Sequence, residues 1–489
     1  MTQYKAFLYK HTATAVFAGL LGFSAATTSL VAKEIYSETN TNDQESESSS
    51  FLSDWWYGEY ATGNWFGVRD TLEDNGIKLG GKYYGAFFGV VDSQGGNRGF
   101  WDQGLEFKGE INTGKLLKVD QLKGVKLFGA VRWRDDRGAA DPNTFVEATS
   151  MFKPSNWISG MGWRLLNFGI EIGSDEYLPI EDMIVFRAGW IQPQKEFVDQ
   201  PLSKLFLNNA INSSKGIGGN IPFGSSFSTW GGSLEVKPAE WAYVKGGLFM
   251  SYPSGAKTQN HGLAFQGYAE DTSQNGLMTI LETGVKPKIG PNELPGHYAM
   301  GGYYYGGEAD SFNGTSQYGQ YGFYWQADQM LFREPSASVE EPAPTGKDTV
   351  DYKSSNKSFK SPVSTEKPKL SDQGLSMFNF VSFAPKYNNI FPFYFHTGLV
   401  YKGLIPTRDA DLTMIALGYG SYSYYNTLAQ RAQGSSKQPN YPLVIEGGYR
   451  VQINKWAFVQ PFIQYIIRPN GTNNVQNATV LGVYTGINF

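Results

Sequence analysis

The sequence predicts an all-β protein: a transmembrane antiparallel β-barrel of about 16 strands. Aromatic residues make up 15% of the 489 residues, there are 58 glycines, and only 18% of the residues are charged. Many segments alternate apolar and polar residues, which is the period of a β-strand. After residue 32 no apolar run reaches the length of a spanning helix. Only helices and closed barrels satisfy their backbone groups in lipid, so the mature chain is either soluble or a barrel.

Composition excludes several other functions. The net charge of −4 gives no reason to expect nucleic acid as a partner, and the absence of cysteine excludes disulfide frameworks and thiolate metal sites. No HExxH, Walker or GxSxG motif is present. The acidic cluster of Asp135, Asp136 and Asp141 lacks the spacing of a calcium loop. We therefore expect no metal, no cofactor and no enzymatic activity.

The N-terminus has the pattern of a secretory signal peptide. Lys5 and Lys10 precede an apolar run over residues 13–26, and small residues follow up to Ala32. The run is too short for a membrane anchor, so we expect residues 1–32 to be removed. Residues 33–54 are acidic, rich in serine and almost free of apolar side chains, which predicts a disordered periplasmic tail. The barrel is then expected over residues 55–489.

The C-terminal segments show the strand pattern most clearly. Within residues 478–489, apolar side chains occupy alternate positions and the chain ends on Phe489, which resembles the assembly signal of outer-membrane barrels. Residues 443–453 and 456–468 carry apolar side chains on one face and Glu, Gln and Arg on the other. An apolar outer face with a wet inner face describes a membrane barrel. A soluble sandwich with its apolar face inward would show the same period.

Counting the alternating segments gives sixteen, an even number as single-chain bacterial barrels require. We predict strands at 76–91, 103–113, 123–134, 161–173, 183–191, 226–237, 241–253, 277–286, 297–308, 318–333, 374–386, 391–402, 411–425, 443–453, 456–468 and 478–489.

The predicted connections alternate between short and long. With the C-terminus in the periplasm, the turns at 238–240 and 453–455 are short and periplasmic, as in outer-membrane barrels. The long connections at 135–160, 192–225 and 254–276 are extracellular. The Pro-, Ser-, Lys- and Glu-rich segment 334–372 is the exception, because it falls on the periplasmic side. Either a strand is miscounted, or the chain carries a low-complexity periplasmic insertion.

Several motifs, in order, resemble the carbohydrate-selective porin family, the OprB-like outer-membrane porins. They cover nearly the whole mature chain: GNWFGVRDTLEDNGIKL from Gly63, FRAGWIQPQKEF from Phe186, STWGGSLEVKPAEWAYVKGGLF from Ser228, FYWQADQMLF from Phe323, YKGLIPTRDAD from Tyr401 and IEGGYRVQINKWAFVQPFIQYIIRPNG from Ile445. The resemblance implies a barrel in the outer membrane of a Gram-negative-type bacterium. It also implies passive diffusion of glucose and other small sugars. The acidic tail and the 334–372 segment depart from the family pattern.

Neutral sugars are rich in hydroxyls, so a selective pore needs donors and acceptors, and charged side chains make the strongest and most directional ones. Alternation places nine charged residues on lumen faces, and these are our candidate sugar contacts: Glu106, Lys126, Arg132, Arg134, Arg187, Glu235, Asp328, Glu446 and Arg450. The alternative for each is that it only solvates the inner wall. Residues 192–225 either fold inward and narrow the pore or form a surface loop.

The expected partners are small neutral sugars and outer-membrane lipid, and the choice between monomer and homotrimer stays open. Three other functions are kept as alternatives. One is a general diffusion porin, and another is a plugged barrel with a structural or adhesive role. The third is a soluble carbohydrate-binding or hydrolytic β protein, which would need a carboxylate pair that nothing in the sequence singles out.

Overall fold

The protein is represented by a computed structural model that describes residues 52–53, 55–135, 145–148, 151–155, 161–174, 177–212, 216–223, 227–252, 260–270, 275–335, 370–436 and 438–489. Residues 1–57 and 58–489 form two separate units, and the second contains the whole barrel. The predicted signal peptide and nearly all of the predicted acidic tail lie outside the described residues.

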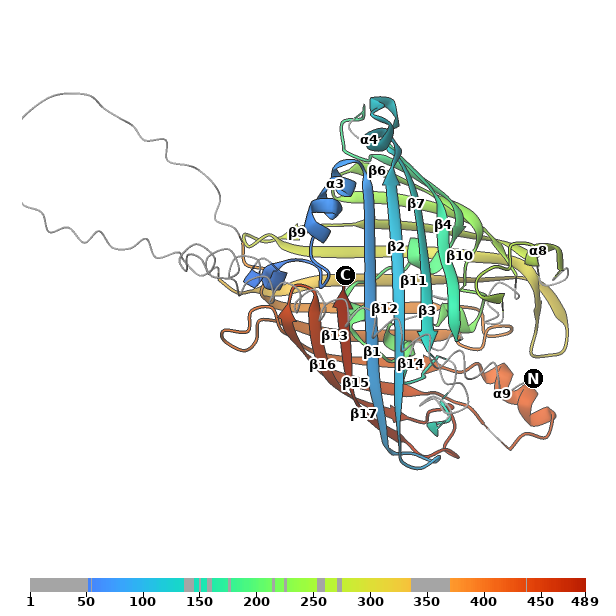
Figure 1. Cartoon of the computed structure of the whole chain (residues 1–489). Coiled ribbons are helices and arrows are strands. Elements are labelled where there is room, and N and C mark those ends of the chain that lie inside the picture. The colour runs from blue at the N-terminus through green and yellow to red at the C-terminus, as the bar shows by residue number, and fades with distance from the viewer. Residues whose placement is uncertain are drawn as a thin grey trace, which may run out of the picture. The chain divides into compact units, whose positions relative to one another are not determined.

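One antiparallel sheet closes on itself to form the barrel (Figure 1). Each strand pairs with its sequence neighbours, except that β8 pairs with β10 and β1 closes the ring by pairing with β17. The two-residue β9 pairs only with the start of β10. Removing it from the 17 strands leaves a ring of 16. The strands are β1 (Ile77–Asp92), β2 (Arg98–Asn112), β3 (Val125–Asp135), β4 (Gly162–Gly173), β5 (Ile184–Ile191), β6 (Thr229–Ala239), β7 (Ala242–Ser251), β8 (Gly276–Val285), β9 (Lys288–Ile289), β10 (Leu294–Asp310), β11 (Ser316–Arg333), β12 (Gly374–Phe383), β13 (Phe393–Lys402), β14 (Leu412–Ser421), β15 (Leu443–Asn454), β16 (Ala457–Ile467) and β17 (Ala478–Asn488).

Among the described residues, helices lie only in the connections between strands and in the segment before β1. None of the described helices is long and apolar enough to cross a membrane. They are η1 (Trp65–Gly67), α3 (Val68–Asp74), α4 (Thr113–Leu117), η2 (Asp120–Leu122), α6 (Pro193–Glu196), η5 (Leu202–Leu205), α7 (Asn209–Asn212), η6 (Ile217–Gly219), α8 (Gly267–Glu270) and α9 (Tyr424–Ala432).

Apolar side chains lie on the outer face of the barrel and polar side chains on the inner face, which is the reverse of a soluble protein. On β16 the apolar Ile463 and Tyr465 are 48% and 41% exposed on the outer face, whereas Gln460 and Gln464 are buried on the inner face. Large apolar side chains are exposed in the same way on the other strands, among them Phe107, Leu127, Phe186, Leu248, Leu281, Phe323 and Ile415. Such an outer wall suits lipid, so the soluble alternative is excluded and the barrel prediction is confirmed.

All sixteen predicted strands have a counterpart in the ring. The strand ends alternate between two rims, which we call the C-terminal rim, where β17 ends, and the distal rim. β11 ends and β12 begins at the C-terminal rim, where the Glu334 N–H donates to the Gln373 carbonyl at 3.0 Å. No strand was miscounted there. The connection between β11 and β12 leaves the same rim as the turns predicted at 238–240 and 453–455, and its residues 336–369 lie outside the described residues.

Glycines let aromatic rings lie flat against neighbouring strands. A Cβ added to Gly482 on β17 would lie 2.2 Å from the Phe87 carbonyl oxygen and 2.3 Å from the Phe462 ring. We therefore expect Gly482→Ala to destabilise the barrel by about 1–3 kcal/mol through overpacking. The measurement is the temperature at which the folded, fast-migrating gel band disappears. Gly447→Ala is the matched control, since its Cβ would meet nothing closer than 3.8 Å; equal melting of the two variants would contradict the packing argument.

Candidate functional site

The long connection between β5 and β6 folds into the barrel. We call residues 192–228 the inward loop; the structure describes it except for 213–215 and 224–226. In Figure 1 the green segment after β5 lies inside the ring, behind β1 to β3. Its apolar side chains are buried against the inner wall, among them Phe197, Phe206, Leu207, Ala210, Ile211, Ile217 and Phe227. Of the two alternatives for this segment, the inward one is therefore the one observed.

Charged contacts hold the beginning of the inward loop against its own strands. Pro193 occupies the first turn of α6, where its fixed φ suits a helix start. At the other end of this helix, Glu196 is buried. Its carboxylate pairs with Arg187 on β5 at 3.1 Å and accepts a hydrogen bond from the Ser233 hydroxyl on β6 at 3.0 Å. Helix α6 is thus fixed across the lumen wall of β5 and β6.

Glu446 on β15 anchors the middle of the inward loop. Its two carboxylate oxygens accept the backbone N–H groups of Leu207 and Asn208 at 2.7 and 2.8 Å. The side chain is 1% exposed, so these bonds are shielded from water. The sequence was right that Glu446 faces inward, but its carboxylate contacts the loop backbone.

Further anchors reach the loop from the strands on both sides of β15. On β16, the Gln460 side-chain amide donates to the Leu205 backbone carbonyl at 2.9 Å, and the Gln464 side-chain amide oxygen accepts from the Asn208 side chain at 3.1 Å. On β13, the Nε2 atom of the buried His396 forms a hydrogen bond with the side-chain amide oxygen of Gln200 at 2.8 Å. The inward loop is therefore fixed to the wall by a buried polar network, and such a network is stable only when all its members are paired.

Three arginines gather on the inner face of β3 and β4. Arg132 and Arg164 are register partners, and Arg134 is the next inward residue along β3. The Arg134 Nε donates to the Tyr84 hydroxyl on β1 at 3.0 Å. The three side chains are only 4–7% exposed. This is a concentrated positive field in a confined part of the lumen, which favours anions and presents directional donors.

Lys195 on α6 lies opposite this arginine cluster. Burial within the barrel lowers its pKa; Arg132 lowers it further, and Glu106 on β2 raises it. Its side chain nevertheless stays exposed to the lumen water. Lys195, Arg132 and Glu106 therefore face the same part of the lumen, and because the inward loop occupies part of the barrel we call this space between α6 and the inner wall of β2 and β3 the constriction. Donors stand on both sides of this constriction, with Glu106 as an acceptor.

A cavity of about 810 Å³, which we call the vestibule, lies in the lumen towards the C-terminal rim. Two of the predicted residues, Glu235 and Asp328, line it, together with Lys245, Glu282 and His297. Glu235 pairs with Lys245 at 3.6 Å, and Glu282 accepts from the Tyr324 hydroxyl at 2.8 Å. The cavity wall carries both signs of charge, as a wet vestibule does.

The three remaining predicted residues are bound to neighbours on the wall. Lys126 and Arg187 share the Glu171 carboxylate at 3.0 and 3.3 Å. Arg450 lies over the Phe458 ring at 4.0 Å, and its Nε donates to the side-chain amide oxygen of Gln460 at 2.8 Å. The structure thus brings Glu106, Arg132 and Arg134 together at the constriction. It places the other six candidates in the vestibule, along the wall or at the loop anchor.

Two residues at the constriction were missed. Arg164 could have been predicted from the sequence. Trp163 is apolar and faces outward on the predicted strand at 161–173, so the next residue, Arg164, faces the lumen. Lys195 could not have been predicted, because a loop has no period from which the direction of a side chain follows. Among the described residues, no group of three His, Asp or Glu side chains is arranged to hold a metal ion.

A closed barrel with an apolar outer wall, a wet lumen and an inward loop that narrows it defines a porin of the outer membrane. The model of the carbohydrate-selective porin, OprB family, matches residues 63–489. The chain therefore belongs to the carbohydrate-selective porin (OprB) family, which is a family of channels.

Individual relatives agree with this assignment. Porin B of Pseudomonas aeruginosa is 26% identical over 303 residues, which cover 54% of this chain and 59% of that porin. A high-pH structure of Pseudomonas putida OprB superposes with a TM-score of 0.71 at 21% identity, covering 88% of this chain and 99% of that one. The low-pH structure of the same porin gives 0.50 at 17% identity, with the same coverage. At these identities the two structures support the fold alone.

Proposed function

We propose that this porin lets glucose and other small neutral sugars diffuse passively through the outer membrane, with no catalysis or energy coupling. The observation that carries the proposal is the constriction, where three arginines and Lys195 provide donors and Glu106 provides an acceptor. Hydroxyl groups of a sugar match both kinds of partner, and each charge-assisted hydrogen bond is stronger than a neutral one. The family to which the chain belongs supports the same substrate class.

The arrangement also suits release. A sugar that enters exchanges its own hydrogen bonds to water, and those of the arginines and the lysine, for bonds between sugar and protein, so it gains only the net free energy of that exchange. A conducting site must bind weakly enough to let its solute leave. The wet vestibule on the C-terminal side then receives the sugar. We place this rim in the periplasm, in keeping with a removed signal peptide over residues 1–32 and an acidic tail over 33–54.

The apolar outer wall is proposed to contact lipid directly. Its exposed Phe, Leu and Ile side chains occur on strands around the whole ring. Exposed apolar area of this extent is stable in lipid and would aggregate in water.

Single-channel recording tests whether sugar binds in the lumen. We expect glucose to reduce the ion current in a saturable, concentration-dependent way, because a sugar at the constriction displaces ions. Glycine, which is smaller and zwitterionic, serves as the control and should reduce the current much less. A current that no sugar reduces would contradict binding in the pore and would favour a general diffusion porin.

A further inference from the structure

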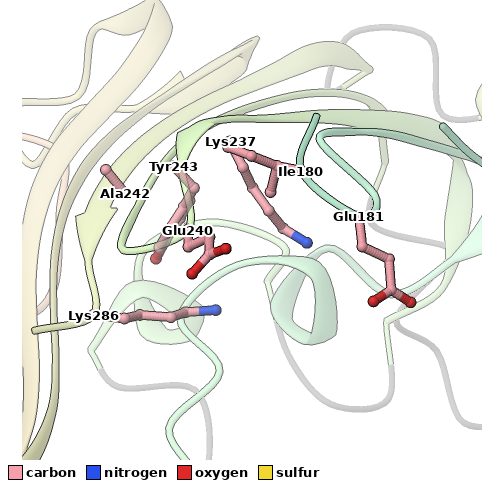
Figure 2. Close-up of a pocket in the computed structure, with 7 residues that line it drawn as sticks. All are labelled: Ile180, Glu181, Lys237, Glu240, Ala242, Tyr243 and Lys286. Atoms are coloured by element: carbon pink, nitrogen blue, oxygen red, sulfur yellow. The ribbon is translucent and has the colours of Figure 1, made fainter. Parts of the chain in front are cut away.

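A separate small pocket opens at the C-terminal rim. It has a volume of about 280 Å³ and is lined by Ile180, Glu181, Lys237, Glu240, Ala242, Tyr243 and Lys286. Figure 2 shows the charged ends of Lys237, Glu240 and Lys286 extending into a common space. The pocket shares Tyr243 and Lys286 with the vestibule. A solute in the vestibule therefore meets this pocket at the rim.

The pocket is assembled from the ends of neighbouring hairpins. Glu181 lies in the turn between β4 and β5, and Lys237 is on the inner face at the end of β6. Glu240 lies in the β6–β7 turn, and Lys286 follows β8. Because antiparallel neighbours turn at the same rim, these four side chains from distant parts of the sequence meet at one place.

Three of the four charged side chains have no ion-pair partner in the described part of the chain, although one of them contacts an aromatic ring. Among the described residues, Glu181, Glu240 and Lys286 form no ion pair, and Lys237 reaches Glu235 only at 4.0 Å. The Lys286 ammonium lies 5.4 Å from the centre of the Tyr243 ring. On the vestibule side, His297 stacks on the same ring at 5.8 Å and Tyr243 donates its hydroxyl hydrogen to Glu282 at 2.9 Å. Tyr243 is therefore fixed, while the charged ends remain available to a solute.

The lining charges identify the class of solute. Two carboxylates and two ammonium groups cancel, so neither anions nor cations are favoured overall. A neutral solute with many hydroxyls can donate to the carboxylates and accept from the ammonium groups. We propose that this pocket is a second sugar subsite, which holds a monosaccharide at the C-terminal rim of the channel. This inference rests on the proposed function, because it takes the permeating solute to be a sugar.

Protection of a single cysteine tests the subsite. The chain has no cysteine, so Ile180→Cys places one thiol in the pocket. We expect glucose to slow modification of this thiol by a small methanethiosulfonate reagent. At a glucose concentration about ten times the half-protecting value, the rate should fall about tenfold. The control is Ile289→Cys on the neighbouring β9, which is 45% exposed and outside the pocket lining, and its rate should not change.

A charge-neutral pair of substitutions tests the charged groups. Glu240→Gln with Lys286→Gln, made in the Ile180→Cys background, should abolish the protection. Lys288→Gln with Glu293→Gln removes an exposed ion pair of 3.9 Å at the same rim and should leave the protection intact. Persistent protection in the first variant would overturn the role of these charges. Protection by glycine and not by glucose would overturn the sugar assignment.

Liposome swelling with the same Ile180→Cys protein separates the two proposals. Rapid glucose entry without protection would overturn the subsite and leave the proposed function intact. Protection without glucose entry would support the subsite and overturn the proposed function. Absence of both would overturn both.

Discussion

Replacing the three constriction arginines should abolish most of the sugar binding in this channel. In the triple variant Arg132→Gln, Arg134→Gln, Arg164→Gln, three positive charges are removed from the constriction. A hydrogen bond from a charged donor contributes about 1.5 kcal/mol or more, so even one lost contact should raise the half-blocking glucose concentration about tenfold. The positive field disappears as well, so the reversal potential in a salt gradient should shift towards cation preference.

Lys118→Gln is the control for the loss of a positive charge outside the constriction. Lys118 follows the last residue of α4 in the β2–β3 connection at the C-terminal rim, and its substitution removes one positive charge, as each of the three arginine substitutions does. Its glucose block and reversal potential should stay close to those of the wild-type channel. If the triple variant, shown to be folded by its gel mobility, binds glucose as the wild type does, the constriction is not the sugar site.

Replacing Glu446 by alanine should release the inward loop and enlarge the pore. The backbone N–H groups of Leu207 and Asn208 would lose their acceptors in a dry environment. Each unsatisfied buried donor costs about 1–3 kcal/mol. The loop can avoid this cost only by leaving the wall, so single-channel conductance should rise. Disaccharides should then enter proteoliposomes at rates closer to glucose.

Two variants show whether anchoring is the reason. Glu446→Gln keeps one acceptor oxygen and should have an intermediate conductance. Glu110→Ala removes a carboxylate from the inner face of β2, away from the loop anchors, and should leave the pore size unchanged. A normal conductance and size limit in Glu446→Ala would show that the inward loop does not depend on this residue.

The barrel could be predicted from the sequence because strand period and membrane environment act on every residue. In β16, the alternation of Ile463 and Tyr465 with Gln460 and Gln464 fixes both the strand and its orientation. Phe489 marks the end of the last strand. An even number of strands allows the first and last strands to pair antiparallel and close the ring. The same alternation placed Arg132, Arg134 and Glu106 correctly on the lumen side.

Alternation does not reveal what an inward side chain meets. Glu446 and Arg134 have the same pattern on their strands, yet one binds the loop backbone and the other lies beside Tyr84. That difference depends on where residues 192–228 lie, and a loop that packs through scattered apolar side chains such as Phe197 and Phe206 has no regular period. Lys195 was missed for the same reason.

The central claim is that this barrel passes neutral sugars selectively, and proteoliposome swelling tests it most directly. Purified protein is reconstituted, and swelling is compared for glucose, disaccharides, glycine and a charged amino acid of glucose's size. We predict that glucose enters faster than the charged solute and faster than the disaccharides. Entry ranked by size alone, with no preference for glucose over a charged solute of the same size, would contradict the claim.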